Sequence, residues 1–196
     1  MGRPVLSTAR IRLQPMTAEH LPLLVQLDSD AEVLRHILGR ARSAEESEDF
    51  WGPICADVDA DAVGLGWWLG FLRDDEQFLG WWDLSPDQPV PAEPVRAEAG
   101  WRLARRHWRQ GYASEGAVAL RDHGFATVGL TEIWAETMAV NVASRRVMTT
   151  LGMRHLRTEH RSWDHPLPGA EQGEVVYSLT REAWADAGGA GSTARR

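Results

Sequence analysis

The 196-residue sequence contains no lysine, because all 21 of its basic residues are arginine. Codon usage in a GC-rich genome explains this bias, and we attach no function to it. Cysteine is nearly absent too, and the single Cys55 cannot form a disulfide within the chain. This favours a cytoplasmic protein. No apolar run reaches the length of a membrane span, and the first residues lack the apolar core of a signal peptide.

A positive net charge is also missing. The formal net charge is −7, so the composition favours neither a nucleic-acid nor a membrane partner. The length suits one domain with its own core. We therefore expect a single domain over residues 1–183 and a disordered tail over residues 184–196, which ends in GGAGSTARR.

Tryptophan is abundant by contrast. Ten are present, and five lie within one third of the chain: Trp67, Trp68, Trp81, Trp82 and Trp101. Such clusters form a core, a substrate pocket or an interface, and the sequence leaves these three alternatives open. Neighbouring residues of a strand point to opposite faces, so at most one member of each adjacent pair serves the same surface.

Hydrophobic periodicity predicts a mixed α/β (α+β) fold with helices on both faces of the sheet. The expected strands are residues 9–14, 66–72, 77–84, 96–104, 131–138, 153–159 and 174–179. The expected helices follow Thr17, follow the capping box at Ser43, and cover residues 114–128 and 141–152. The proline-rich residues 86–94 are expected to form a loop.

Two of these helices carry explicit predictions of their buried faces. The helix after Ser43 is expected to bury Phe50 and Ile54. The helix at residues 141–152 is expected to bury Ala143, Val147 and Leu151 and to end at Gly152.

A turn of small residues joins the strand at 96–104 to the helix that follows, in the stretch RRHWRQGYASEGAVALRDHGF (residues 105–125). A helix N-terminus exposes unpaired N–H groups and the positive end of the helix dipole, so it can bind an anion. Gly111 and Ala113 let a phosphate approach the main chain, and Arg109 adds positive charge. The turn suits a diphosphate. The alternative is a plain connection with Ser114 as the helix N-cap, and this turn alone, which is neither a GxGxxG nor a Walker loop, does not decide between them.

A second motif, N-V-A-S-R-R-V-M-T-T-L-G-M at residues 141–153, follows the next expected strand. Together with W-R-Q-G-Y-A-S-E-G at residues 108–116, it resembles the GNAT superfamily of acyl-CoA-dependent N-acyltransferases, in particular the RimJ/RimL-like branch. The resemblance extends to TARIRLQPM (residues 8–16) and VVYSLTREAW (residues 175–184), so it spans most of the chain. It implies a mixed, mostly antiparallel central sheet that is splayed in the middle.

The resemblance also implies acetyl-CoA as co-substrate, with no metal. The residues that would hold its diphosphate through main-chain N–H groups are Arg109, Gln110, Gly111, Tyr112, Ala113 and Ser114. The strand edge at Leu103 and Ala104 would pair with the pantetheine arm. Asn141 would hydrogen-bond to that arm, and Ser144 would lie near the sulfur. Arg145 or Arg146 could reach the phosphates, although helix-surface arginines are more often simply solvated.

Acyl transfer to an amine needs a neutral amine, a polarised thioester and a proton for the departing thiolate. Proximity of the two reactants and a strand N–H that binds the oxyanion would supply much of the rate. Many family members donate the proton from a tyrosine four residues before the Gly that closes the last helix. That position is Met148 here. Because methionine cannot donate a proton, the role is vacant or falls to Ser144.

For the base we expect Glu98, which shares a strand face with Gly100 and Arg102. The alternative for Glu98 is an ordinary strand glutamate paired with an arginine, and Glu136 on the neighbouring strand is the rival base. The scattered histidines, such as His107, show no convincing metal-ligand spacing.

The expected activity is direct acetyl transfer from acetyl-CoA to a primary amine, either a protein N-terminus or a small molecule. The resemblance assigns the acceptor site to residues 28–47 and 161–173, where acidic residues would suit a cationic amine or serve only for solubility. One alternative is a catalytically inactive CoA-binding or sensor module of the same fold, and another is an unrelated phosphate-binding enzyme. Whether the protein forms a homodimer is left open.

Overall fold

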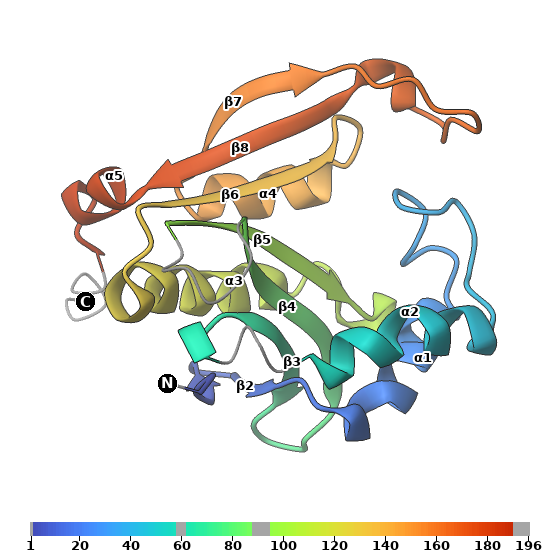
Figure 1. The fold of residues 1–196 in the computed structure, drawn as a ribbon, viewed down its shortest axis with the longest axis horizontal. Coiled ribbons are helices and arrows are strands. Elements are labelled where there is room, and N and C mark those ends of the chain that lie inside the picture. The colour runs from blue at the N-terminus through green and yellow to red at the C-terminus, as the bar shows by residue number, and fades with distance from the viewer. Residues whose placement is uncertain (1, 58–61, 88–94, 190–196) are drawn as a thin grey trace.

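The computed structural model describes residues 2–57, 62–87 and 95–189. They form an eight-stranded sheet in the order β1-β2-β3-β4-β5-β6-β8-β7, with helices on both sides (Figure 1). The strands are β1 (Leu6–Ser7), β2 (Ile11–Pro15), β3 (Gly66–Leu72), β4 (Phe78–Pro86), β5 (Arg96–Leu103), β6 (Glu132–Met138), β7 (Arg154–Glu159) and β8 (Glu174–Thr180). The helices are α1 (Leu21–Asp28), α2 (Ala44–Ala56), α3 (Tyr112–His123), α4 (Val142–Thr150) and α5 (Arg181–Asp186).

One strand pair differs from all the others in the sheet. β5 and β6 are parallel, whereas the other neighbouring strands are antiparallel. Their register covers three pairs, Arg96 with Glu132, Ala97 with Ile133 and Glu98 with Trp134. Beyond these pairs the two strands diverge, as Figure 1 shows to the right of their starting points. The predicted mixed, mostly antiparallel sheet that is splayed in the middle is confirmed.

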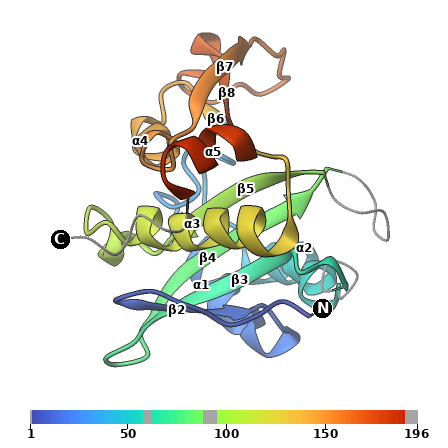
Figure 2. The ribbon, with the colours of Figure 1, turned by 90° about the vertical axis from the view of Figure 1, so that its left-hand side faces the viewer.

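The two faces of the sheet carry separate cores. In Figure 2, α3 lies in front of β3, β4 and β5, while α1 and α2 lie behind them. The core on the α3 side includes Leu84, Leu120 and Phe125. The core on the α1 and α2 side includes Leu24 and Trp51. The prediction of helices on both faces is therefore confirmed.

The tryptophan pairs divide between these cores as strand alternation requires. Trp68 and Trp82 are fully buried in the core on the α3 side. Trp67 and Trp81 face the other way, and their ring centroids lie 4.7 Å apart beside α2. Of the three alternatives for these pairs, packing in the core is the one observed.

Several sequence expectations need correction. In α2, Phe50 is exposed and the buried face carries Ser47, Trp51 and Cys55, because the helix packs on the sheet through Trp51, whose ring contacts Trp67 and Trp81. In α4, Ala143 is exposed, while Val147 and Met148 are buried. Of the residues expected to be buried, Val147 and Leu151 are buried and Ile54 is partly buried, so the predictions that fail are Phe50 and Ala143.

A short helix continues past residue 183, where the tail was expected to begin. Helix α5 reaches Asp186, and its Trp184 donates from Nε1 to Asp122 Oδ1 at 2.9 Å. The Trp184 ring also packs against Phe125, with centroids 5.3 Å apart. The expected tail from residue 184 was thus placed too early, and residues 190–196 lie outside the described residues. So does most of the expected loop at 86–94, since β4 runs to Pro86 and residues 88–94 are not described. Among the residues that the structure describes, no helix is long and apolar enough to cross a membrane.

Helix α3 packs unusually close to β4 at one glycine. A Cβ atom added to Gly116 would lie 2.5 Å from Cε2 of Trp82, closer than any side chain can approach. The same indole donates from Nε1 to the carbonyl of Ala113 at 3.0 Å. Gly116 and Trp82 therefore fix how closely the first turn of α3 approaches the sheet.

We expect Gly116→Ala to lower the free energy of unfolding by about 1–3 kcal/mol, because the new methyl group must displace Trp82. Gly52→Ala is the matched control, since Gly52 lies inside α2 with no atom within 4 Å of its added Cβ. It should raise the free energy of unfolding by about 0.5–1 kcal/mol. Urea denaturation measures both, and equal effects would contradict the close contact.

Candidate active site

The turn before α3 has a backbone that favours an anion. Arg109 and Gly111 both have positive φ, 60° and 85°, and successive N–H groups in such turns converge on one point. Gly111 is the N-cap of α3, and no side chain caps the helix. Ser114, considered above as the N-cap, instead lies inside the helix, which begins two residues earlier than expected. The first amides of α3 therefore have no partner within the helix.

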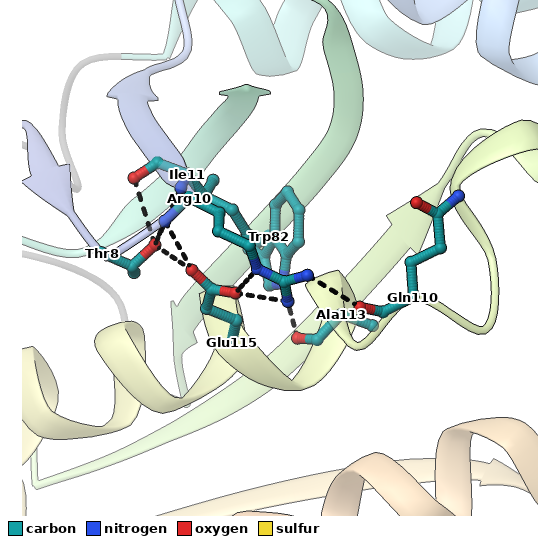
Figure 3. Close-up of polar contacts among 7 residues, drawn as sticks. All are labelled: Thr8, Arg10, Ile11, Trp82, Gln110, Ala113 and Glu115. Carbon is teal, nitrogen blue, oxygen red and sulfur yellow. Dashed lines mark hydrogen bonds and ion pairs between the residues drawn. The ribbon is translucent and has the colours of Figure 1, made fainter. Parts of the chain in front are cut away.

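Side chains from the loop between β1 and β2 hold this turn in place (Figure 3). The carboxylate of Glu115 accepts hydrogen bonds from the backbone N–H of Arg10 at 2.9 Å and from its Nε at 2.7 Å. Thr8 donates its hydroxyl to the same carboxylate. Arg10 Nη1 then donates to the carbonyl of Gln110 at 3.1 Å. The helix dipole alone would favour a carboxylate in the first turn of a helix. Glu115 also has a structural role, because it ties the start of α3 to the loop before β2.

The arginines around the turn do not all remain available for a ligand. Arg106 donates from Nη2 to the carbonyl of Phe78, and Gln110 donates from Nε2 to the carbonyl of Arg106. Arg105 and Arg109 are exposed, and no hydrogen bond or ion pair of their side chains occurs within the described ranges. These two cations, next to the uncapped helix end, fit an anion such as a diphosphate.

Beyond Glu98, β5 has an open edge, because β6 no longer pairs with it. Every second residue of β5 directs its main-chain N–H and C=O groups toward this edge. The N–H of Ala104 donates to the carbonyl of Leu79 at 2.8 Å, so it faces β4 and is not available at the splayed edge. By strand alternation the N–H groups of Trp101 and Leu103 face the opposite edge, toward β6. The carbonyl of Leu103 accepts the indole N–H of Trp108 at 2.8 Å. Of the two expected pantetheine contacts, the geometry fits Leu103 better than Ala104, and it adds Trp101.

Helix α4 begins at the expected motif. Asn141 is its N-cap: Oδ1 accepts from the N–H of Ser144 at 3.2 Å, and Nδ2 donates to Thr137 Oγ1 at 2.9 Å. The Ser144 hydroxyl makes no hydrogen bond to any described residue. Met148, one turn further on, is only 1% exposed and is part of the core. The position at which many family members carry a tyrosine is therefore occupied here by a buried core residue.

The two arginines of that motif have different surroundings. Arg145 donates from Nη1 to the carbonyl of Ala139 at 2.9 Å, which ties it to the turn before α4. Arg146 is exposed, and its guanidinium bonds to none of the residues described. Of the two, Arg146 is the one free to meet a phosphate.

The two candidate bases differ in their partners. Arg161 donates to both carboxylate oxygens of Glu136, at 2.5 and 2.7 Å. Glu98 has no hydrogen bond or ion pair to any part of the chain that is described, so it is not the arginine-paired glutamate considered as the alternative. Burial, and after it the charge of Glu136, raises the pKa of Glu98.

Sequence reasoning missed a third carboxyl group, Asp83 on β4. It is 5% exposed and lies opposite Gly100 of β5. Burial raises its pKa to about 7, although a hydrogen bond from Ser85 acts in the opposite direction. The available signal was one aspartate within the otherwise apolar run FLGWWDL.

A buried ion cluster lies on the same face of β5. Asp28, which is fully buried, accepts from Arg102 Nη1 at 2.8 Å, from Arg42 Nη1 at 2.6 Å and from Trp51 Nε1 at 2.9 Å. It thereby joins α1, α2 and the segment between them to β5. A pocket of about 600 Å³ lies beside it, between the end of α1 and residues 104–106. It borders the end of β5 and does not include Glu98.

Comparison with known proteins agrees with this geometry. The acetyltransferase (GNAT) domain family matches residues 10–154, and the chain belongs to this family. It is an acetyl-CoA-dependent acetyltransferase.

Individual relatives share most of their length with this chain. The FsC-acetyl coenzyme A-N(2)-transacetylase of Aspergillus fumigatus is 39% identical over 93% of this chain and 79% of its own. The uncharacterized N-acetyltransferase YnaD of Bacillus subtilis is 31% identical over 91% and 98%. Among solved structures, RimL, a ribosomal-protein alpha-N-acetyltransferase in complex with coenzyme A, has a TM-score of 0.73 at 18% identity, covering 93% of this chain and 99% of its own. Spermidine N-acetyltransferase from Vibrio cholerae, with CoA and spermine, has a TM-score of 0.73 at 13% identity over 91% and 99%.

We expect Gly111→Asp to weaken acetyl-CoA binding by about tenfold or more, that is by at least ~1.4 kcal/mol. The substitution strains a left-handed residue and places a carboxylate where a diphosphate would lie. Gly152→Asp is the matched control, because Gly152 has the same φ of 85° but closes α4. Isothermal titration calorimetry measures both, and unchanged affinity of the Gly111 variant would overturn the assignment of the diphosphate site.

Proposed function

We propose that this enzyme moves the acetyl group of acetyl-CoA directly to a primary amine. The observation that carries the proposal is the uncapped start of α3 beside the open edge of β5. Residues 109–114 would hold the diphosphate, and the main-chain groups of Leu103 and Trp101 would pair with the pantetheine arm. Both motifs, at 108–116 and 141–153, support placement near the RimJ/RimL-like branch.

Glu98 is the base in this proposal. It lies at the last of the three pairs between β5 and β6, so it stands where the strands begin to diverge. It has no counter-ion among the described residues, and its raised pKa suits a group that takes a proton near neutral pH. Glu136 is the weaker candidate, because Arg161 binds both of its carboxylate oxygens.

Ser144 is the candidate donor to the departing thiolate. Its hydroxyl is half-buried in the first turn of α4, where the N-cap Asn141 fixes the backbone. A thiolate is a good leaving group, so a weak acid is sufficient. A main-chain N–H at the open edge of β5 that does not pair with the pantetheine arm is the candidate to bind the thioester oxygen as negative charge develops on it.

The acceptor would be a cationic amine. The negative charge of Glu136 acts on both Glu98 and Glu174, and Arg161 is the cation that opposes it at both. A surplus of carboxylates favours an ammonium group over an anionic acceptor. The name of the Aspergillus relative places the acetyl group on a nitrogen, N(2), of its acceptor, and the Vibrio structure contains spermine.

One assay separates this proposal from the inactive CoA-binding module. Thiol release from acetyl-CoA is measured with a diamine, a polyamine, an amino-acid amide and a short peptide with a free N-terminus. Release with at least one of these amines, with the acetylated product confirmed by mass spectrometry, supports the enzyme. Tight binding of acetyl-CoA with no release from any of them would favour the module.

For the base, we expect Glu98→Gln to lower kcat by about a hundredfold or more, with little change in the affinity for acetyl-CoA. The amide keeps the size of the side chain but cannot take the proton. Glu136→Gln should have the smaller effect. Glu132→Gln, at the outer end of the β5–β6 contact and paired with Arg96, is the control. A larger loss in the Glu136 variant would reverse the assignment.

A further inference from the structure

Asp83 occupies a space that the facing strand keeps clear for it. It lies directly opposite Gly100 in the β4–β5 register, and a Cβ atom added at Gly100 would be 2.2 Å from Asp83 Oδ1. Any other residue at position 100 would displace the carboxyl group. Glycine is poorly suited to the interior of a strand, so its presence here serves the carboxyl group of Asp83.

This carboxyl group has no counter-ion in the described part of the chain. The cation nearest to it on β5, Arg102, donates to Asp28 instead, at 2.8 Å. Arg42 donates to the same Asp28, at 2.6 Å. A buried carboxyl group without a counter-ion costs stability in its charged form, so Asp83 is a poor choice for a purely structural role.

A hydroxyl group lies between Asp83 and the proposed base. Ser85 donates from Oγ to Asp83 Oδ2 at 2.7 Å. Ser85 is also the register partner of Glu98, as Asp83 is of Gly100. Directly paired residues point to the same face with Cβ atoms about 5 Å apart. Glu98, Ser85 and Asp83 thus follow one another across one face of β4 and β5.

The chemistry of amide formation needs more than one proton acceptor. An ammonium acceptor loses one proton before its nitrogen attacks the thioester carbonyl carbon, and a second as the C–N bond forms and the C–S bond breaks. One of the two protons ends on the thiolate sulfur and the other reaches solvent. A single carboxylate can hold only one of them at a time.

We propose that Asp83 is a second proton acceptor of the reaction, linked to Glu98 through the Ser85 hydroxyl. This inference rests on the proposed function. Glu98 takes the first proton from the ammonium, turns toward its register partner Ser85 and passes the proton to that hydroxyl, which gives its own proton to Asp83. Glu98 is then charged again and takes the second proton, which replaces the one that Ser144 gives to the departing thiolate. With Glu98 ionised once more, Asp83 returns its proton to solvent through Ser85 and Glu98.

The charges around Asp83 set the direction of its pH response. Glu98 and Arg102 face it from β5, Glu136 with Arg161 lies beyond Glu98, and Asp28 with Arg42 lies behind Arg102. Burial raises the pKa of Asp83 to about 7. The group accepts a proton only when ionised, so kcat should rise as the pH increases through about 7.

The decisive variant is Asp83→Asn, whose side chain keeps the size of aspartate and can still accept from Ser85. We expect kcat above pH 7 to fall by about tenfold to a hundredfold and the rise near pH 7 to disappear, with unchanged affinity for acetyl-CoA. Asp74→Asn, exposed in the β3–β4 turn, is the control. A variant that keeps the wild-type kcat and pH profile would overturn the proposal.

Ser85→Ala tests the link, because it keeps the carboxyl group and removes the hydroxyl. It should lower kcat as much as Asp83→Asn does, whereas a normal rate would show that no relay passes through Ser85. Carbon-13 NMR of labelled aspartate, compared with the Asp83 variant, gives the Asp83 titration without any acceptor, and a midpoint below about 5 would also overturn the proposal. Failure of the proposed function would look different, because wild-type enzyme would then release no thiol with any amine.

Discussion

The short parallel contact between β5 and β6 is the constraint on which the rest of the structure depends. Three residue pairs join an antiparallel half, β1 to β5, to a second antiparallel half made of β6, β8 and β7. A longer contact would close the sheet and satisfy every main-chain group along β5. Because the contact ends at Glu98, the N–H groups of Trp101 and Leu103 remain without a strand partner, and a ligand can bind there in place of a strand.

A parallel connection also requires a crossover helix, and α3 is that helix. Its position determines where its N-terminal amides lie, so the packing of α3 is part of the binding site. Gly116 lets it approach Trp82, and Glu115 ties it to Arg10. On the opposite face, Asp28 joins α1 and α2 to Arg102 of β5. Contacts of α3 on one face of the sheet and of Asp28 on the other thus hold the start of α3 and β5 in place.

Much of this arrangement could be predicted from local patterns. The turn at Gly111 and the motif at Asn141 are sequence-adjacent signals, and the alternation of Trp67 with Trp68 follows from strand geometry. Helix faces were less predictable: Phe50 and Trp51 are neighbours of similar hydrophobicity, and the contact of Trp51 with Trp67 and Trp81 of the sheet, a tertiary feature, decides which is buried. Asp83 could not be assigned a role, because its environment depends on Gly100, Ser85 and Glu98, which lie on two strands whose register is a tertiary feature.

The arginines determine which carboxylates can act as bases. Lysine is absent, and guanidinium groups bind carboxylates in fixed, often bidentate geometry. Arg161 binds both carboxylate oxygens of Glu136, and Arg102 and Arg42 both bind Asp28. Glu98 and Asp83 receive no such partner within the described residues and are partly or wholly buried, so protonation is favoured in both. The same distribution of arginines therefore stabilises the fold around α1 and leaves two neighbouring carboxyl groups able to exchange protons beside the open edge of β5.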